Sequence, residues 1–199
     1  MVKEGFPFVL VPLGIAALLA LFGLWIAAIP LILIALFMVY FFRDPYRVVP
    51  AGDGLIVSAA DGRVTRIESN DDSKLVSVFL SPLDVHINRS PIAGKVSKIT
   101  YTRGRKSPAT SNNASLVNER NSLTIDGENL TVTCTQIAGI LARRIVCWPK
   151  EGDILERGQK FGLIKFSSRT DVLMPPNVEI TVQLGDKVRG GETIIGRLQ

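Results

Sequence analysis

His86 is the only histidine in this chain of 199 residues, and it lies in the segment FLSPLDVHINRSP. Imidazole titrates near neutral pH without a perturbing environment, so His86 is the first candidate for proton transfer. A lone histidine is also often a structural residue whose ring binds a backbone carbonyl. The neighbouring chemistry has to decide between these two interpretations.

Two further residue types could work with an imidazole. Ser167 and Ser168 are adjacent in FGLIKFSSRTDVLMPP, between two β-rich runs. A serine hydroxyl is a poor nucleophile until a base accepts its proton, and a carboxylate can orient that base and stabilise its cation. Asp61 is a candidate carboxylate, because it stands where an internal repeat has Ala93. A carboxylate gained in a turn is either a cap or a catalytic group.

Two internal repeats indicate the fold that positions these residues. SAADGRVTRI, at 58–67, matches SPIAGKVSKI, at 90–99, and EGDILERGQKFG matches LGDKVRGGETIIG. The second pair places G-D-x-x-x-x-G turns at 152–158 and 185–191. Such paired turns resemble those of biotinyl and lipoyl carrier domains, which are flattened β-barrels with a pseudo-twofold axis. This likeness concerns the fold only.

The remainder of 46–199 also has a β pattern. Short apolar runs such as GLIVSA, KLVSVFL and FGLIKF are separated by Gly, Pro, Asp and Asn, which are strand and turn signals. No amphipathic helix of useful length is visible there. We therefore predict a mainly β domain, a barrel-sandwich of the biotinyl/lipoyl-carrier type, over 46–199.

Residues 1–45 form a different segment. Phe6 to Phe42 contains no charged residue and exceeds the roughly 20 apolar residues that one helix needs to cross a bilayer. The run is too long for a secretory signal, so we predict a retained helical membrane anchor. It is either one tilted span or, as we favour, a hairpin that turns near Gly23 to Trp25, with Pro12 and Pro30 loosening each arm.

Charge predicts the location of the domain. Lys3 precedes the anchor and Arg43 and Arg47 follow it, which puts both ends of a hairpin, and the domain, on the cytoplasmic side of the cell membrane. The formal net charge of +5 suits anionic lipid headgroups. No basic stripe with interleaved aromatics points to nucleic acid. Cys134 and Cys147 are isolated, so neither a metal site nor a disulfide is predicted.

Several blocks together resemble a known family, the short, single-domain phosphatidylserine decarboxylases. They follow that family's order from about Phe41 to the end of the chain, and each is weak alone. The blocks are FFRDPYRVVP, SAADGRV, FLSPLDVHINRSPIAGKV, NERN, QIAGILARRIVCW, EGDILERGQKFGLIKFSSRTDV and GDKVRGGETIIGRL.

This resemblance implies a proenzyme that cuts itself between Ser167 and Ser168. The products would be a large chain ending at Ser167 and a small chain beginning with a pyruvoyl cofactor made from Ser168. His86 and Asp61 match the remaining positions of the family's triad. The pyruvoyl ketone would serve as the electron sink for decarboxylation of a phospholipid, phosphatidylserine, to phosphatidylethanolamine. His86 is our candidate for the acid that then protonates the product.

The sequence departs from the family at the cleavage site, where the family has Gly-Ser and this chain has Ser167-Ser168. Glycine reaches backbone conformations that an L-residue enters at a cost of about 1 to 3 kcal/mol. The chain is then a natural variant that still processes more slowly, a variant that has lost activity, or an engineered form held uncut. A displaced cut, with Ser167 attacking at Phe166, is a further alternative.

Two other classes of function compete with the enzyme. A membrane-tethered carrier or adaptor barrel would need a lysine at a hairpin tip, whereas 167–170 reads Ser-Ser-Arg-Thr. A pyruvoyl enzyme for a soluble amino acid would have no reason to stay at a bilayer. The choice between ester-linked phosphatidylserine and ether-linked archaetidylserine is left open, as is a homo-oligomer.

Overall fold

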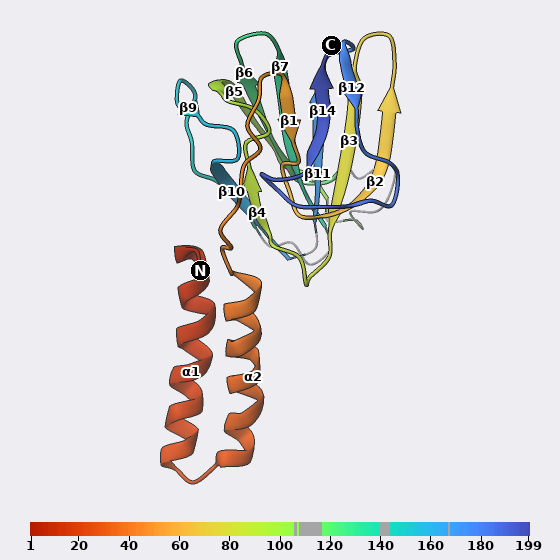
Figure 1. The fold of residues 1–199 in the computed structure, drawn as a ribbon. Coiled ribbons are helices and arrows are strands. Elements are labelled where there is room, and N and C mark those ends of the chain that lie inside the picture. The colour runs from red at the N-terminus through yellow and green to blue at the C-terminus, as the bar shows by residue number, and fades with distance from the viewer. Residues whose placement is uncertain (106, 108–116, 140–143, 167) are drawn as a thin grey trace. The chain divides into compact units, whose positions relative to one another are not determined.

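The computed structural model describes residues 1–199 apart from 106, 108–116, 140–143 and 167 (Figure 1). The chain divides into two compact units, Met1–Tyr46 and Arg47–Gln199. The first unit holds η1 (Lys3–Gly5), α1 (Phe6–Leu21) and α2 (Trp25–Phe41). The second holds β1 (Leu55–Val57), β2 (Gly62–Ser69), β3 (Lys74–Leu80), β4 (Ile87–Arg89), β5 (Gly94–Thr102), β6 (Arg120–Asp126), β7 (Thr131–Ala138), β8 (Arg144–Cys147), β9 (Ile154–Leu155), β10 (Lys160–Lys165), β11 (Ser168–Met174), β12 (Val178–Ile180), β13 (Lys187–Val188) and β14 (Ile194–Leu198).

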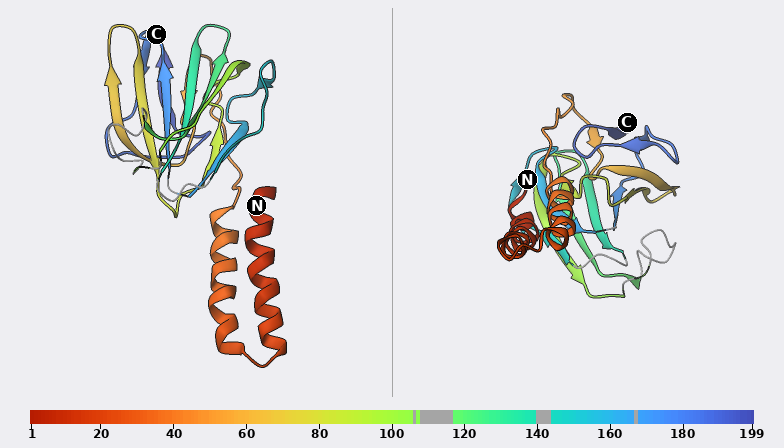
Figure 2. Two further views of the ribbon diagram at one scale, coloured as in Figure 1. Left: turned by 180° about the vertical axis from the view of Figure 1, so that it is seen from behind. Right: turned by 90° about the horizontal axis from the view of Figure 1, so that it is seen from below.

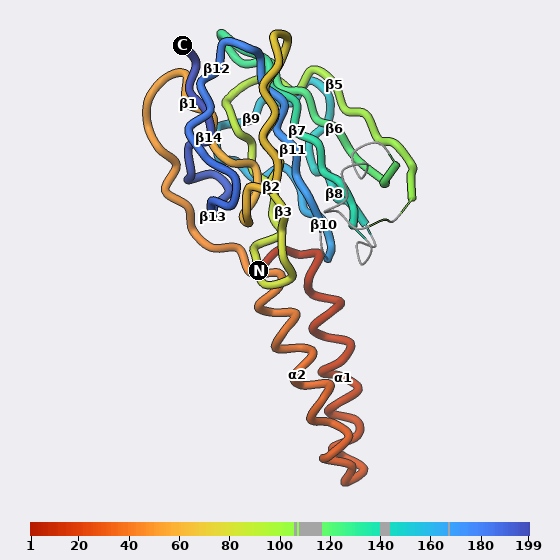
Figure 3. Tube along the Cα trace, turned by 90° about the vertical axis from the view of Figure 1, so that its right-hand side faces the viewer, coloured from red at the N-terminus to blue at the C-terminus, as the bar shows by residue number. Residues whose placement is uncertain are grey.

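The first unit is a helical hairpin in which α1 and α2 lie side by side (Figures 1 and 3). The chain reverses at Gly23, whose φ of 75° lies in the left-handed region that favours glycine. Small residues fill the contact between the helices, since Ala16, Ala28 and Ala35 are buried. Small side chains allow two helix backbones to approach closely.

The large apolar side chains of this hairpin point outward. Leu21 is 84% exposed and Ile26 is 87% exposed, and most other large apolar side chains of the two helices are exposed as well. The segment Lys3–Leu21 is long and apolar enough to cross a membrane, and α2 is shorter at 17 residues. A hairpin with small residues inside and large apolar ones outside is unsuited to water.

The second unit is built from antiparallel strands in three sheets (Figures 1 and 2). The largest has eight strands in the order β13-β2-β3-β11-β7-β6-β5-β9, and the others have the orders β4-β10-β8 and β1-β14-β12. The large sheet curls round a core that includes Val78, Leu123, Phe161 and Val172. The prediction of a mainly β domain is thus confirmed, while the carrier-type barrel stays a prediction.

The two sequence repeats occupy matching places in this unit. The Val96 N–H donates to the carbonyl of Asp153 at 2.8 Å, and the Val64 N–H donates to the carbonyl of Asp186 at 2.9 Å. Both β2 and β5 also have a register shift directly after the valine. Each copy of the first repeat is therefore bonded to a copy of the second in the same way.

The glycine corners match as well. The Gly158 N–H donates to the Ser90 carbonyl and the Gly191 N–H donates to the Ser58 carbonyl, both at 2.8 Å. Their φ angles are 77° and 80°, so both corners need glycine. Equal bonds in both copies indicate a pseudo-twofold relation between the halves. Asp61 and Ala93 lie at the same place in the two halves, and only one half carries a carboxylate there.

Candidate active site

Ser168 begins β11, the strand that lies between β3 and β7 in the large sheet. Its Cα partners are Leu80 on β3 and Ala138 on β7. The residue is 0% exposed, and its Oγ is buried without a hydrogen-bond partner among the described residues. Burying an unpaired hydroxyl costs about 1 to 3 kcal/mol, so such a group in a native protein calls for an explanation, and a catalytic role is one.

The backbone just before this serine is strained. Phe166 has a φ of 68°, and it is the one residue other than glycine with a positive φ in the described part of the chain. For a bulky L-residue this conformation costs about 1 to 2 kcal/mol, and strain of this kind is concentrated at functional sites. Ser167, the residue predicted to precede the cut, lies outside the described residues.

His86 precedes β4 and is 2% exposed. Its Nδ1 lies 3.0 Å from the carbonyl oxygen of Asp84. Because a carbonyl oxygen can only accept, the neutral ring carries its proton on Nδ1 in this contact. The other ring nitrogen, Nε2, is then the one that can accept a proton.

The turn before His86 is held by its own side chains. Asp84 Oδ2 accepts from the backbone N–H of Ser81 at 2.9 Å and from the Ser81 hydroxyl at 2.7 Å. The Asp84 N–H donates back to the Ser81 carbonyl at 2.9 Å. A turn closed by three hydrogen bonds presents the Asp84 carbonyl, and hence the ring of His86, in one orientation.

Two contacts join the segments of Ser168 and His86. Leu80, the partner of Ser168, is followed directly by the turn that leads to His86. Asn88 lies two residues after His86, and Thr170 lies two residues after Ser168. Asn88 Nδ2 donates to Thr170 Oγ1 at 2.9 Å. Since side chains two residues apart on a strand share a face, this bond aligns β4 with β11 at the level next to the serine.

A third contact comes from β10, the strand that leads towards the serine pair. The Ile164 N–H donates to the His86 carbonyl at 3.3 Å. The fold thus brings the histidine segment to the place where β10 ends and β11 begins. Sequence separation between residues 86 and 168 gives no hint of this neighbourhood.

Asp61 is held by a different set of groups. Its Oδ2 lies 2.6 Å from Nη2 of Arg47, and its Oδ1 accepts the Gly190 N–H at 2.8 Å. Burial holds the pKa of Asp61 above its ordinary value, although the Arg47 guanidinium and the Gly190 N–H lower it, and the nearby charge of Asp84 adds to the rise. The Asp84 effect indicates that Asp61 lies near the turn that leads to His86.

Proteins of similar sequence are known. A family model described as Phosphatidylserine decarboxylase matches residues 34–196. The phosphatidylserine decarboxylase proenzyme of Syntrophus aciditrophicus (strain SB) is 44% identical over 207 residues, covering 98% of this chain and 95% of that protein. The proenzyme of Symbiobacterium thermophilum is 47% identical over 205 residues, covering 98% of this chain and 94% of that protein.

The chain belongs to the phosphatidylserine decarboxylase family. The predicted family membership is therefore confirmed, and so is the prediction of an enzyme of this family. The roles of Ser168, His86 and Asp61 within such a decarboxylase stay predictions.

The structure of this decarboxylase family member also contains polar residues that motif reasoning passed over. Asn88, Thr170 and Gln136 are 0% exposed. Gln136 Nε2 donates to Asn88 Oδ1 at 2.9 Å, and Asn121 Nδ2 donates to Gln136 Oε1 at 3.1 Å. This buried network holds β4, β11, β7 and β6 together. The NERN block was the available signal, because it contains Asn121.

Arg47 is the other residue of the candidate site that sequence reasoning missed. It stands in FFRDPYRVVP and was counted only among the charges that orient the anchor. Its contact with Asp61 joins residues 14 apart in sequence, and its contact with Glu192 joins residues 145 apart. Only the fold brings these three charges together.

Proposed function

We propose that the chain is a proenzyme that cleaves itself between Ser167 and Ser168 and then decarboxylates phosphatidylserine. The observation that carries this proposal is the buried Ser168 hydroxyl, which lacks a partner among the described residues and opens a strand aligned with the His86 segment. The family supports the substrate, because the similar proteins are phosphatidylserine decarboxylase proenzymes.

Self-cleavage begins with attack by Ser168 Oγ on the carbonyl carbon of Ser167. The peptide bond between the two residues breaks, an ester forms to Oγ, and the amino group of residue 168 is freed. Loss of the Cα proton and cleavage of the Cβ–Oγ bond then release a carboxylate on Ser167. Water replaces the remaining nitrogen as ammonia, which leaves a ketone at position 168.

His86 and Asp61 have distinct roles in this scheme. His86 Nε2 accepts the proton of the Ser168 hydroxyl, while Nδ1 stays bonded to the Asp84 carbonyl. Asp61 supplies negative charge that stabilises the imidazolium. The same imidazolium is our candidate donor of the proton that replaces carbon dioxide on the lipid product.

The residues around position 168 fit a pyruvoyl group. Conversion of the serine to a ketone removes a hydroxyl that has no partner among the described residues, so no described side-chain hydrogen bond of Ser168 is lost. After the cut, pairing of β11 with both β3 and β7 keeps the new terminus in place. The pyruvoyl ketone supplies the electron sink that decarboxylation requires.

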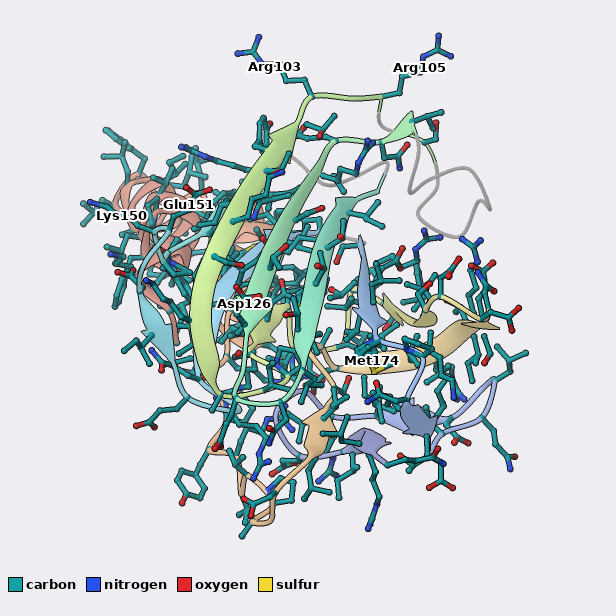
Figure 4. All side chains as sticks on the ribbon, turned by 90° about the horizontal axis from the view of Figure 1, so that it is seen from above. Arg103, Arg105, Asp126, Lys150, Glu151 and Met174 are labelled. Carbon is teal, nitrogen blue, oxygen red and sulfur yellow. The ribbon has the colours of Figure 1, made fainter. Side chains whose placement is uncertain are left out.

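The setting we propose is the cytoplasmic face of the cell membrane, with the helical hairpin as the anchor. Exposed Leu21 and Ile26 support contact with lipid. Basic side chains support a partner of negative charge, and Arg103 and Arg105 point away from the sheet beyond β5 (Figure 4). The matched Asp153 and Asp186 turns support a carrier-type barrel that holds the small and large chains together after cleavage.

Intact mass spectrometry of the purified chain tests the proposal. We expect two fragments whose boundary lies between Ser167 and Ser168, and a small fragment with a carbonyl at its terminus that reacts with hydroxylamine. A displaced boundary after Phe166 would make Ser167 the nucleophile. A single intact chain that cannot decarboxylate phosphatidylserine would instead identify an inactive or adaptor form.

Replacing Ser167 with glycine is expected to speed self-cleavage. Removing the side chain lifts a conformational cost of about 1 to 3 kcal/mol, which corresponds to about 5- to 150-fold in rate. Pulse-labelling followed by gel separation of the fragments measures this rate. Ser167→Ala is the matched control, because it removes the hydroxyl but keeps the Cβ. Equal acceleration by Ser167→Ala would show that backbone freedom is not the cause.

A further inference from the structure

Arg47 binds two carboxylates with the two ends of its guanidinium. Nη2 lies 2.6 Å from Asp61 Oδ2, and Nη1 lies 3.2 Å from Glu192 Oε2. The arginine side chain is 7% exposed, and those of Asp61 and Glu192 are 15% and 22% exposed. A charge-assisted pair at this burial is strong, and loss of the cation would leave the partly buried Asp61 carboxylate without an ion-pair partner.

The other side of each carboxylate is also occupied. Asp61 Oδ1 accepts the Gly190 N–H at 2.8 Å, and Glu192 Oε1 accepts the Val48 N–H at 3.0 Å. Glu192 therefore accepts hydrogen bonds both from the side chain of Arg47 and from the backbone N–H of Val48. The guanidinium is fixed by Glu192 and in turn fixes Asp61.

Charge near Asp61 is unbalanced without this arginine. Burial is the main cause that raises the pKa of Asp61, Arg47 is the cation that lowers it, and the charge of Asp84 raises it by a smaller amount. Glu192 stands behind the guanidinium, with Arg189 3.8 Å from Glu192 Oε2. The pKa of Glu192 is lowered mainly by the hydrogen bond from the Val48 N–H and to a smaller extent by Arg47.

We propose that Arg47 is a positioning residue for self-cleavage, because its guanidinium holds the Asp61 carboxylate ionised and in one orientation near the histidine turn. This inference rests on the proposed role of Asp61 in the proenzyme. Arg47 also lies in the stretch between α2 and β1. The segment that follows α2 in sequence would therefore supply the cation that binds the Asp61 carboxylate.

An arginine suits this position better than a lysine. The planar guanidinium reaches two carboxylates on separate turns at once, one through each terminal nitrogen. A lysine ammonium is a compact point charge and cannot reproduce both contacts with the same geometry. The conservative substitution therefore separates the effect of charge from the effect of orientation.

Arg157 offers a matched control. Its guanidinium also binds the stretch before β1, donating to the Pro50 carbonyl at 2.7 Å and to the Gly52 carbonyl at 2.8 Å. Within the described part of the chain, Arg157 forms no hydrogen bond with Asp61, His86 or Ser168. Loss of Arg157 loosens the same stretch of chain without changing the charge beside Asp61.

The test measures the first-order rate of self-cleavage between pH 5 and 9 for the full-length chain in lipid nanodiscs. The variants are Arg47→Met, Arg47→Lys, Asp61→Asn and Arg157→Ala, each in the parent and in a Ser167→Gly background. We expect Arg47→Met to slow cleavage by about 100-fold at pH 7. Because Arg47 lowers the pKa of Asp61, any rise of the rate with pH that reports ionisation of Asp61 should lie at higher pH in Arg47→Met than in the parent.

Arg47→Lys should bring the rise back towards the pH of the parent while cleavage remains slower, and Arg157→Ala should cut within about twofold of the parent. If Asp61→Asn is blocked while Arg47→Met keeps the parent rate and pH profile, the inference fails and the proposed function survives. If Asp61→Asn cuts normally, the proposed role of Asp61 fails. Should Arg47→Met not fold, Arg47→Lys decides, and cleavage within about twofold of the parent overturns the inference.

Discussion

Replacing Ser168 with alanine leaves the precursor uncut, without a carbonyl and without decarboxylase activity. The substitution removes the attacking oxygen and the only source of the ketone at that position. The free energy of unfolding should stay within about 1 kcal/mol of the parent value, because the buried Oγ has no partner among the described residues to lose. Intact mass spectrometry and thermal unfolding measure the two effects separately.

Ser77→Ala is the matched control for this experiment. Ser77 is also 0% exposed, and its Oγ likewise has no partner among the described residues. It lies on the neighbouring strand β3, where its Cα pairs with Asp171. The Ser77→Ala variant should be cut at the parent rate. If Ser168→Ala were instead cut at the same boundary as the parent, Ser168 would have no role in the mechanism.

Replacing His86 with alanine is expected to slow self-cleavage by about 10² to 10⁴-fold, the usual contribution of a positioned proton-transfer group. The physical reason is that the Ser168 hydroxyl then has no base to accept its proton. Timed sampling of the precursor after synthesis, with the fragments quantified by mass spectrometry, gives the rate. The fold should be retained, since the Asn88–Thr170 bond that aligns β4 with β11 is untouched.

His86→Gln distinguishes a catalytic histidine from a structural one. Glutamine keeps an N–H that can donate to the Asp84 carbonyl, but it has no nitrogen that takes up a proton near neutral pH. Cleavage by this variant should be about as slow as that of His86→Ala. A glutamine variant that cuts like the parent would mean that His86 only holds the turn.

Much of the architecture could be predicted from local pattern. An uncharged run at Phe6 to Phe42 predicts apolar helices long enough to cross a bilayer, because water solvates such a surface poorly. The strands follow from short apolar runs between turn residues, and the repeated Gly-Asp turns predicted matched places that the structure contains. The apolar run, the strands and the turns all depend on residues that are close in sequence, so they can be predicted from the sequence.

The candidate nucleophile and base were also within reach of the sequence, but by resemblance of several blocks taken together. The unusual backbone of Phe166 was not, since a positive φ in a phenylalanine is imposed by the surrounding fold and contradicts its own preference. The buried links from Asn88 to Thr170 and Gln136 were also beyond reach, because they join strands that sequence reasoning could not pair.

The sequence by itself determined the apolar helical segment, the β character of the remainder, the family and the serine pair, because each depends on residue type and short spacing. It favoured a hairpin over one long span without deciding between them. Only the tertiary structure decided that Arg47 meets Asp61 and Glu192, and that the His86 turn lies where β10 passes into β11. Those meetings depend on how strands register and close round one core. Free energies of packing summed over the domain set that register, and no single segment encodes it.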